Sequence, residues 1–147
     1  LIGYRSYFMT NNKGLGIMNA IFFGYEVFMD GFGSNPHGSM VAHETGRSTN
    51  FGLINSQERG QLFIGPGVEV YEGMIVGQNA KAMDLRVNVA KEKQLSNMRA
   101  KSDGAMEFLD TPHEMGLEDA LEYIGDDELV EVTPKSIRMR KMDLKAR

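Results

Sequence analysis

The spacing of hydrophobic and polar residues changes twice within the first 40 residues. The apolar residues of LIGYRSYFM recur at mixed spacings that favour a helix over residues 1–9 rather than a strand. In LGIMNAIFFGYEVF, residues 15–28, alternation around Ile21 and Phe23 predicts a strand. The segment DGFGSNPHG, residues 30–38, is rich in Gly, Asn and Pro and predicts a loop. This loop is the best candidate for a domain boundary.

Short apolar runs separated by glycine fill the middle of the chain. The runs at residues 62–64 and 74–76 predict compact β-structure with tight bends and leave room for few long helices. Further on, DLRVNV places Leu85, Val87 and Val89 on one face of a strand. The strand is expected to run outward into the next segment, so that this segment would project as a loop.

The last third of the chain contains one helical pattern between strand patterns. AMEFL, residues 105–109, is strand-like, and GLEDALEYIG, residues 116–125, predicts a helix. Gly116 is the favoured N-cap, and Thr111, followed by Pro112 and Glu114, offers a competing start. ELVEV, residues 128–132, and SIRMRKM, residues 136–142, predict two further strands. Together these elements predict an α+β fold: a β-rich mixed domain, either barrel-like or a twisted sheet, with one clear short helix.

Composition narrows the class of protein. The 147 residues have a formal net charge of −4 and no cysteine, which excludes disulfides, thiolate metal sites and cysteine nucleophiles and favours the cytoplasm. No apolar run approaches the roughly 20 residues that span a bilayer, and the first residues lack the order of a signal peptide. The sequence opens on Leu1, inside a segment predicted to be structured. We therefore expect a fragment of a longer protein with domains upstream.

Charge is strongly segregated along the chain. Residues 1–80, 81–101, 102–132 and 133–147 carry formal charges of −2, +4, −11 and +5. The segment 102–132 contains no Lys or Arg at all. A chain polarised in this way can attract a polyanion through its basic parts although its overall charge is negative.

The basic segment NVAKEKQLSNMRAK, residues 88–101, has two readings. It can be a solvated hairpin that the following acidic segment neutralises. Alternatively it is a phosphate-binding finger, in which lysines attract the phosphates and Arg99 binds one phosphate with two donors. The polar side chains that would bond the backbone or base edges are Asn88, Gln94, Ser96 and Asn97. It contains no aromatic residue, so base stacking is not its mode of binding. Charge alone leaves both readings open.

Known catalytic and metal-binding patterns are missing from the sequence. No GxxxxGK[ST] loop or GxSxG elbow occurs. His37, His43 and Glu44 are close in sequence but match no metal-ligand spacing, and residues 126–128 lack the glycine and alternating ligands of a calcium loop. We therefore predict neither a catalytic site nor a metal site in this chain.

Several longer motifs resemble one known family. NSQERGQLFIGPGVEVYEGMIVG and DDELVEVTPKSIRMRK are the most specific, and LIGYRSYFMT, GLGIMNAIFFGYE, KQLSNMRA and LEDALEYI occur in the same order along the chain. Together they resemble the C-terminal part of the BipA/TypA translational GTPases, over nearly the whole length.

The resemblance implies a domain organisation and a set of partners. Residues 1–28 look like the closing helix and strand of the ferredoxin-like domain V shared with elongation factor G, and residues 29–147 like the family-specific C-terminal domain. GTP and magnesium belong to a GTPase domain upstream, and no cofactor is expected in this chain. The implied partners are ribosomal RNA and the acceptor end of an A-site tRNA. We also expect that the protein is a monomer and does not contact a membrane.

The resemblance also implies which residues contact RNA. The segment DLRVNVAKEKQLSNMRAK matches a family loop that reaches toward the tRNA, although KEKQ and KSDG differ from the family pattern. The candidate nucleic-acid-binding residues are Lys81, Arg86, Asn88, Lys91, Lys93, Asn97, Arg99 and Lys101. A possible second basic contact consists of Lys135, Arg138, Arg140 and Lys141. The alternative to RNA binding is a protein-interaction or structural cap domain whose basic loop is neutralised within the molecule.

Overall fold

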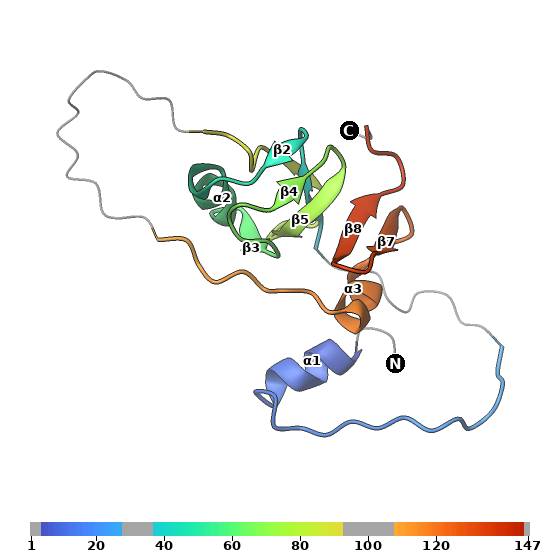
Figure 1. The fold of residues 1–147 in the computed structure, drawn as a ribbon. Coiled ribbons are helices and arrows are strands. Elements are labelled where there is room, and N and C mark those ends of the chain that lie inside the picture. The colour runs from blue at the N-terminus through green and yellow to red at the C-terminus, as the bar shows by residue number, and fades with distance from the viewer. Residues whose placement is uncertain (1–3, 28–36, 93–107, 146–147) are drawn as a thin grey trace, which may run out of the picture.

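The computed structural model describes residues 4–27, 37–92 and 108–145 (Figure 1). The helices in these ranges are α1 (Tyr4–Asn11), α2 (Asn50–Gln57) and α3 (Leu117–Tyr123). The strands are β1 (Ser39–Ala42), β2 (Gly46–Arg47), β3 (Gly60–Leu62), β4 (Glu69–Val70), β5 (Met74–Asn79), β6 (Leu85–Val87), β7 (Glu128–Val132) and β8 (Ile137–Lys141).

One mixed sheet organises the domain. Its strands pair in the order β6-β1-β5-β8-β7, with β1 and β6 parallel and the other pairs antiparallel. β3 joins the same sheet by pairing with residues 77–79 of β5, while β8 pairs with Met74 and Ile75. β2 and β4 form a separate two-stranded sheet. Over the described residues the large sheet ends at β6 and β7 and does not close into a barrel, so the predicted α+β, β-rich fold is confirmed in its open form.

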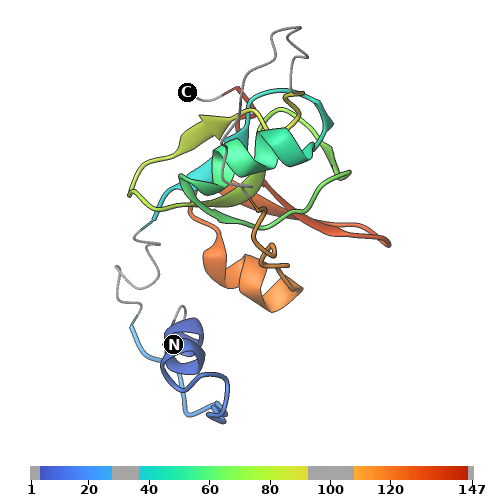
Figure 2. The same cartoon turned by 90° about the vertical axis from the view of Figure 1, so that its left-hand side faces the viewer.

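The helices α2 and α3 cover opposite faces of the sheet (Figure 2). Met74 and Val76 of β5 pack with Leu53 of α2, whereas Ile75 packs with Ala120 of α3. This division follows from the strand period of two, which sends successive side chains to opposite faces. Burying a leucine such as Leu53 stabilises the fold by about 2 kcal/mol. Two small cores therefore share one sheet.

Most of the predicted elements in the second half of the chain are confirmed. α3 begins after Gly116, whose backbone N–H donates to Asp119 Oδ2 at 3.2 Å. β6, β7 and β8 lie within the segments predicted as strands, and β5 covers the apolar run at 74–76. α1 falls mainly within the helix predicted for residues 1–9 and continues to Asn11. These elements have apolar periodicities that local sequence is sufficient to specify.

α2 was not predicted, because glycine at position 52 argues against a helix. The structure explains this glycine by close packing: a Cβ atom there would lie 2.4 Å from the carbonyl oxygen of Val89. Thr49 caps the helix, since its side chain accepts a hydrogen bond from the backbone N–H of Gly52. Close approach to the strand end at Val89 thus offsets the low helix propensity.

The strand expected over residues 15–28 is not formed in the described residues 15–27. Its apolar side chains are exposed, with Phe23 96% and Ile21 93% accessible to solvent. No described strand pairs with this segment, so its backbone lacks the ladder partner that a strand requires. The strand expected at 105–109 falls mostly outside the described residues, and Phe108 and Leu109 belong to no strand.

Candidate nucleic-acid interface

Lys141 at the end of β8 is buried and surrounded by carboxylates. Its Nζ atom lies 2.5 Å from Asp84 Oδ2, 2.9 Å from Asp127 Oδ2 and 2.9 Å from Glu128 Oε1, and only 8% of its side chain is exposed. Burial alone would lower the pKa of the Lys141 ammonium, but the hydrogen bonds to Asp84, Asp127 and Glu128 outweigh it and raise the pKa. The ammonium is therefore charged and already neutralised inside the fold.

A hydrogen-bonded network continues from this ion cluster into the core. Ser39 Oγ donates to Glu128 Oε1 at 2.6 Å and lies 3.1 Å from Tyr123 Oη. The backbone N–H of Ser39 donates to Asp84 Oδ1 at 2.8 Å. Burial raises the pKa of Tyr123 to about 12, so its hydroxyl stays protonated at neutral pH. The network joins the starts of β1 and β7 to the end of β8 and has a structural role.

Two of the predicted RNA-contacting arginines also have partners within the protein. Arg86 lies 3.3 Å from Glu72 Oε1 and donates to the carbonyl oxygen of Leu144 at 3.1 Å. Arg140 Nε lies 2.7 Å from Glu131 Oε1, and the same carboxylate accepts a hydrogen bond from Tyr71 Oη at 2.6 Å. Burial, followed by this hydrogen bond, raises the pKa of Tyr71. Arg140 therefore joins β8 to β7, whereas Arg86 ties β6 to two segments outside the strands.

Four other predicted cations are placed differently. Lys81, Lys91 and Lys135 are exposed, and Arg138 is half-buried. Among the residues that the structure describes, none of these four forms an ion pair. The Lys91 ammonium lies 6.0 Å from the centre of the Phe51 ring, at the outer limit of a cation–π contact. Their charges are available to an external anion.

The remaining predicted residues divide into one described amide and four residues beyond the described ranges. The Asn88 side chain donates to Glu44 Oε1 at 2.7 Å and accepts from the backbone N–H of Ala90 at 3.1 Å, so it fixes the local turn. The residues Lys93, Asn97, Arg99 and Lys101 lie outside the described residues. Their role remains a prediction.

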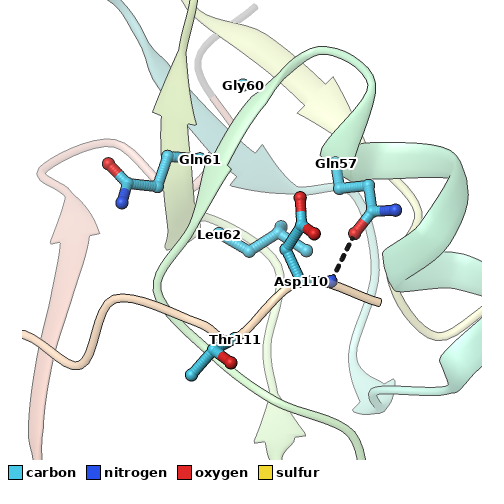
Figure 3. Close-up of a pocket in the computed structure, with 6 residues that line it drawn as sticks. All are labelled: Gln57, Gly60, Gln61, Leu62, Asp110 and Thr111. Carbon is cyan, nitrogen blue, oxygen red and sulfur yellow. Dashed lines mark hydrogen bonds between the residues drawn. The ribbon is translucent and has the colours of Figure 1, made fainter. Parts of the chain in front are cut away.

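The structure also identifies contacts that sequence reasoning missed, at the two ends of the undescribed segment 93–107. On one side, Thr49 Oγ1 donates to the carbonyl oxygen of Lys91 at 2.5 Å. On the other, Gln57 Nε2 donates to the carbonyl oxygen of Phe108 at 2.7 Å. Gln57 Oε1 accepts from the N–H of Asp110 at 3.0 Å, the bond drawn in Figure 3. The only signal in the sequence was that threonine is a common helix N-cap.

Two other classes of site have no support in the described residues. No cluster of three or more His, Cys, Asp or Glu side chains in these residues is arranged to hold a metal ion. None of the helices described is long and apolar enough to cross a membrane.

Comparisons with known domains and with known proteins point to the same family. The TypA/BipA C-terminal domain matches residues 37–146. The chain is 44% identical over 142 residues to the large ribosomal subunit assembly factor BipA of Synechocystis sp., covering 97% of the chain and 24% of that protein. It is 46% identical over 145 residues to the protein of the same name from Salmonella typhimurium, covering 98% of the chain and 24% of that protein.

A plant relative shows the same pattern. The chain is 45% identical over 141 residues to the putative elongation factor TypA-like SVR3, chloroplastic, of Arabidopsis thaliana, covering 96% of the chain and 21% of that protein. The chain therefore spans about a quarter of the length of these curated relatives. By its matched domain and its near-complete coverage by these relatives, the chain belongs to the TypA/BipA family.

Proposed function

We propose that this chain binds the large ribosomal subunit, using the basic segment 81–101 to contact RNA phosphates. Two of the relatives described above are named large ribosomal subunit assembly factors. RNA is the main anionic surface of a ribosomal subunit, and Lys and Arg side chains bind it chiefly through phosphates. The segment charge of +4 suits such a surface.

The observation that carries this proposal is the unequal neutralisation of the cations. Arg86, Arg140 and Lys141 pair with carboxylates of the fold, whereas Lys81 and Lys91 are exposed and form no ion pair with any described residue. The proposed RNA contacts are therefore Lys81 and Lys91, together with Lys93, Arg99 and Lys101.

The acidic segment offers these lysines fewer partners than its charge suggests. Glu118 pairs with Arg5 at 2.6 Å, and Asp127 pairs with Lys141. Two of the acids that could have neutralised the basic segment are thus engaged elsewhere. This supports binding to an external anion over self-neutralisation.

The family resemblance suggests a specific target within the ribosome. Within the ribosome, we propose the acceptor end of an A-site tRNA as a target of segment 81–101. We propose that only Lys135 and Arg138 make the second RNA contact. The other two candidates, Arg140 and Lys141, are held in ion pairs within the fold. We propose that the protein acts as a monomer in the cytoplasm.

The proposed role of this chain is binding, with GTP hydrolysis carried out by another part of the protein. GTP and magnesium would bind to a GTPase domain upstream, since the chain has no nucleotide-binding motif. We assign residues 1–28 to the end of a domain like domain V of elongation factor G and residues 29–147 to the C-terminal domain. The start of the matched domain at residue 37 supports this boundary.

The test is the salt dependence of binding to purified large ribosomal subunits. Changing Lys91, Lys93, Arg99 and Lys101 together to Glu should weaken binding by more than tenfold at moderate salt. It should also lower the slope of log affinity against log salt by about 1 for each phosphate that the variant no longer binds. The matched control changes the exposed residues Lys13, Arg47, Arg59 and Lys145 to Glu, which alters the net charge equally.

The alternative function is a structural or protein-interaction cap. It is favoured at three positions by the ion pairs of Arg86, Arg140 and Lys141. If the cap function extended to the basic segment, the variant with Lys91, Lys93, Arg99 and Lys101 changed to Glu would lose thermal stability. It would also bind subunits as well as the control variant does. That result would reject RNA contact by the segment.

A further inference from the structure

α2 lies between the two ends of segment 93–107. The chain enters this segment after Glu92 and leaves it at Phe108. Thr49, which caps the start of α2, contacts the entering end, and Gln57, the last residue of α2, contacts the leaving end. Eight residues of helix span about 12 Å, so one rigid element sets the separation of the two ends.

The entering end is held by both the backbone and the side chain of Thr49. The N–H of Thr49 donates to the carbonyl oxygen of Val89 at 2.9 Å, and Thr49 Oγ1 donates to the carbonyl oxygen of Lys91 at 2.5 Å. The same hydroxyl oxygen accepts from the N–H of Gly52 at 3.0 Å. One side chain therefore caps the helix and ties Lys91 to it.

The leaving end is held by the side-chain amide of Gln57. This amide donates to the carbonyl oxygen of Phe108. It also accepts from the N–H of Asp110, the bond drawn in Figure 3, so one side chain binds a carbonyl and an N–H of the same backbone stretch. A cavity of about 250 Å³, lined by Gln57, Gln61, Asp110 and Thr111 among others, separates this backbone from β3. Beyond the cavity, the N–H of His113 donates to the carbonyl oxygen of Leu62 in β3 at 2.9 Å. The attachment of residues 108–110 themselves depends on Gln57, together with the packing of Leu109 against the core.

We infer that α2 is a clamp for the RNA-contacting segment, and that Thr49 and Gln57 are positioning residues for RNA binding. The inference rests on the proposed function, because it assigns these residues to the same interface. Neither side chain has to touch RNA. The clamp fixes Lys91 at one end, and Phe108 and Asp110 at the other, before binding, so these positions need no further ordering on the ribosome.

The experiment uses two uncharged substitutions in the 147-residue chain. Thr49→Val keeps the shape of the side chain but removes the hydroxyl, and Gln57→Met keeps its length and helix propensity but removes both hydrogen bonds. Binding to purified large ribosomal subunits is measured across a salt series. The controls are Thr49→Ser, which retains the hydroxyl, and Asn55→Met, which changes an exposed amide on the same helix.

The expected result is a loss of affinity without a change in electrostatics. The double variant lacks three hydrogen bonds that order the ends, so affinity should fall roughly tenfold. The salt slope should equal that of the unmodified chain, because the number of bound phosphates is the same. Thr49→Ser and Asn55→Met should bind normally, and the N–H of Asp110 should exchange faster with solvent in Gln57→Met.

Several outcomes separate this inference from the proposed function. The clamp alone would be overturned if the double variant bound subunits within twofold of the unmodified chain while the variant with Lys91, Lys93, Arg99 and Lys101 changed to Glu still lost binding. A loss of affinity in Gln57→Met, with normal binding by the variant that carries four glutamates in the basic segment, would reject the phosphate contacts. It would also overturn the clamp as stated, because the positioned segment would then not be the one that contacts RNA phosphates. Gln57→Met by itself keeps the test valid if Thr49→Val destabilises the helix cap, since Gln57 lies at the other end of α2.

Discussion

Replacing Lys141 by methionine is expected to destabilise the domain strongly. Methionine keeps the apolar stem of the side chain but removes the ammonium that neutralises Asp84, Asp127 and Glu128. Removing one partner of a buried ion pair costs about 3–5 kcal/mol, because the other charge is left uncompensated. The three carboxylates do not contribute equally to that cost.

The exposure of each carboxylate decides the magnitude. The side chains of Asp84 and Asp127 are 44% and 69% exposed, so water screens them and each pair contributes roughly 0–1 kcal/mol. Glu128 is only 5% exposed, but it keeps hydrogen bonds from Ser39 Oγ and the N–H of Gly125. We therefore expect a loss near the lower limit, about 3 kcal/mol.

Urea denaturation measures this loss directly. The denaturation midpoint should fall with an unchanged slope, which means lower stability with the same surface exposed on unfolding. Adding Glu128→Gln should recover about 1–2 kcal/mol, because it removes the buried uncompensated charge. The exposed Lys135→Met is the matched control and should leave the midpoint unchanged. A loss below about 1 kcal/mol for Lys141→Met, or no recovery in the double variant, would refute this reasoning.

Two further predictions concern burial and packing. The pKa of Tyr123, raised by burial from 10.0 to about 12, means that the folded chain keeps a proton that the unfolded chain releases. Its contribution to stability should therefore be complete below pH 10 and fall as pH rises toward 12, and Tyr123→Phe should make this limb shallower in urea titrations at several pH values. Tyr71 and Lys141, whose pKa values are also raised, account for the slope that remains, and an unchanged limb would contradict the assignment. Gly52→Ala should lower stability by about 1–3 kcal/mol in thermal melts, because its Cβ would meet the Val89 carbonyl, whereas Gly65→Ala, with its nearest atom at 3.8 Å, should not. Equal melting temperatures for the two glycine variants would show that α2 can shift at no cost.

Local patterns in the sequence predicted much of the fold. α3, β6, β7 and β8 were recognisable from the spacing of their apolar residues, and α1 from its mixed spacing. The prediction failed for α2, where tertiary packing against Val89 requires a glycine inside a helix. It also failed for residues 15–27, whose alternating pattern finds no described strand to pair with. In both cases the outcome depends on a neighbour that is distant along the chain.

By itself, the sequence determined the segregation of charge, the motifs of the TypA/BipA family and most of the regular elements of the sheet domain. Only the tertiary structure decided which cations are free to meet an anion. Lys141 and Lys91 are equally basic in the sequence, yet the carboxylates that neutralise Lys141 come from positions 84, 127 and 128. Ion pairs form between side chains that folding brings within a few ångströms, so charge counted along the chain cannot reveal them.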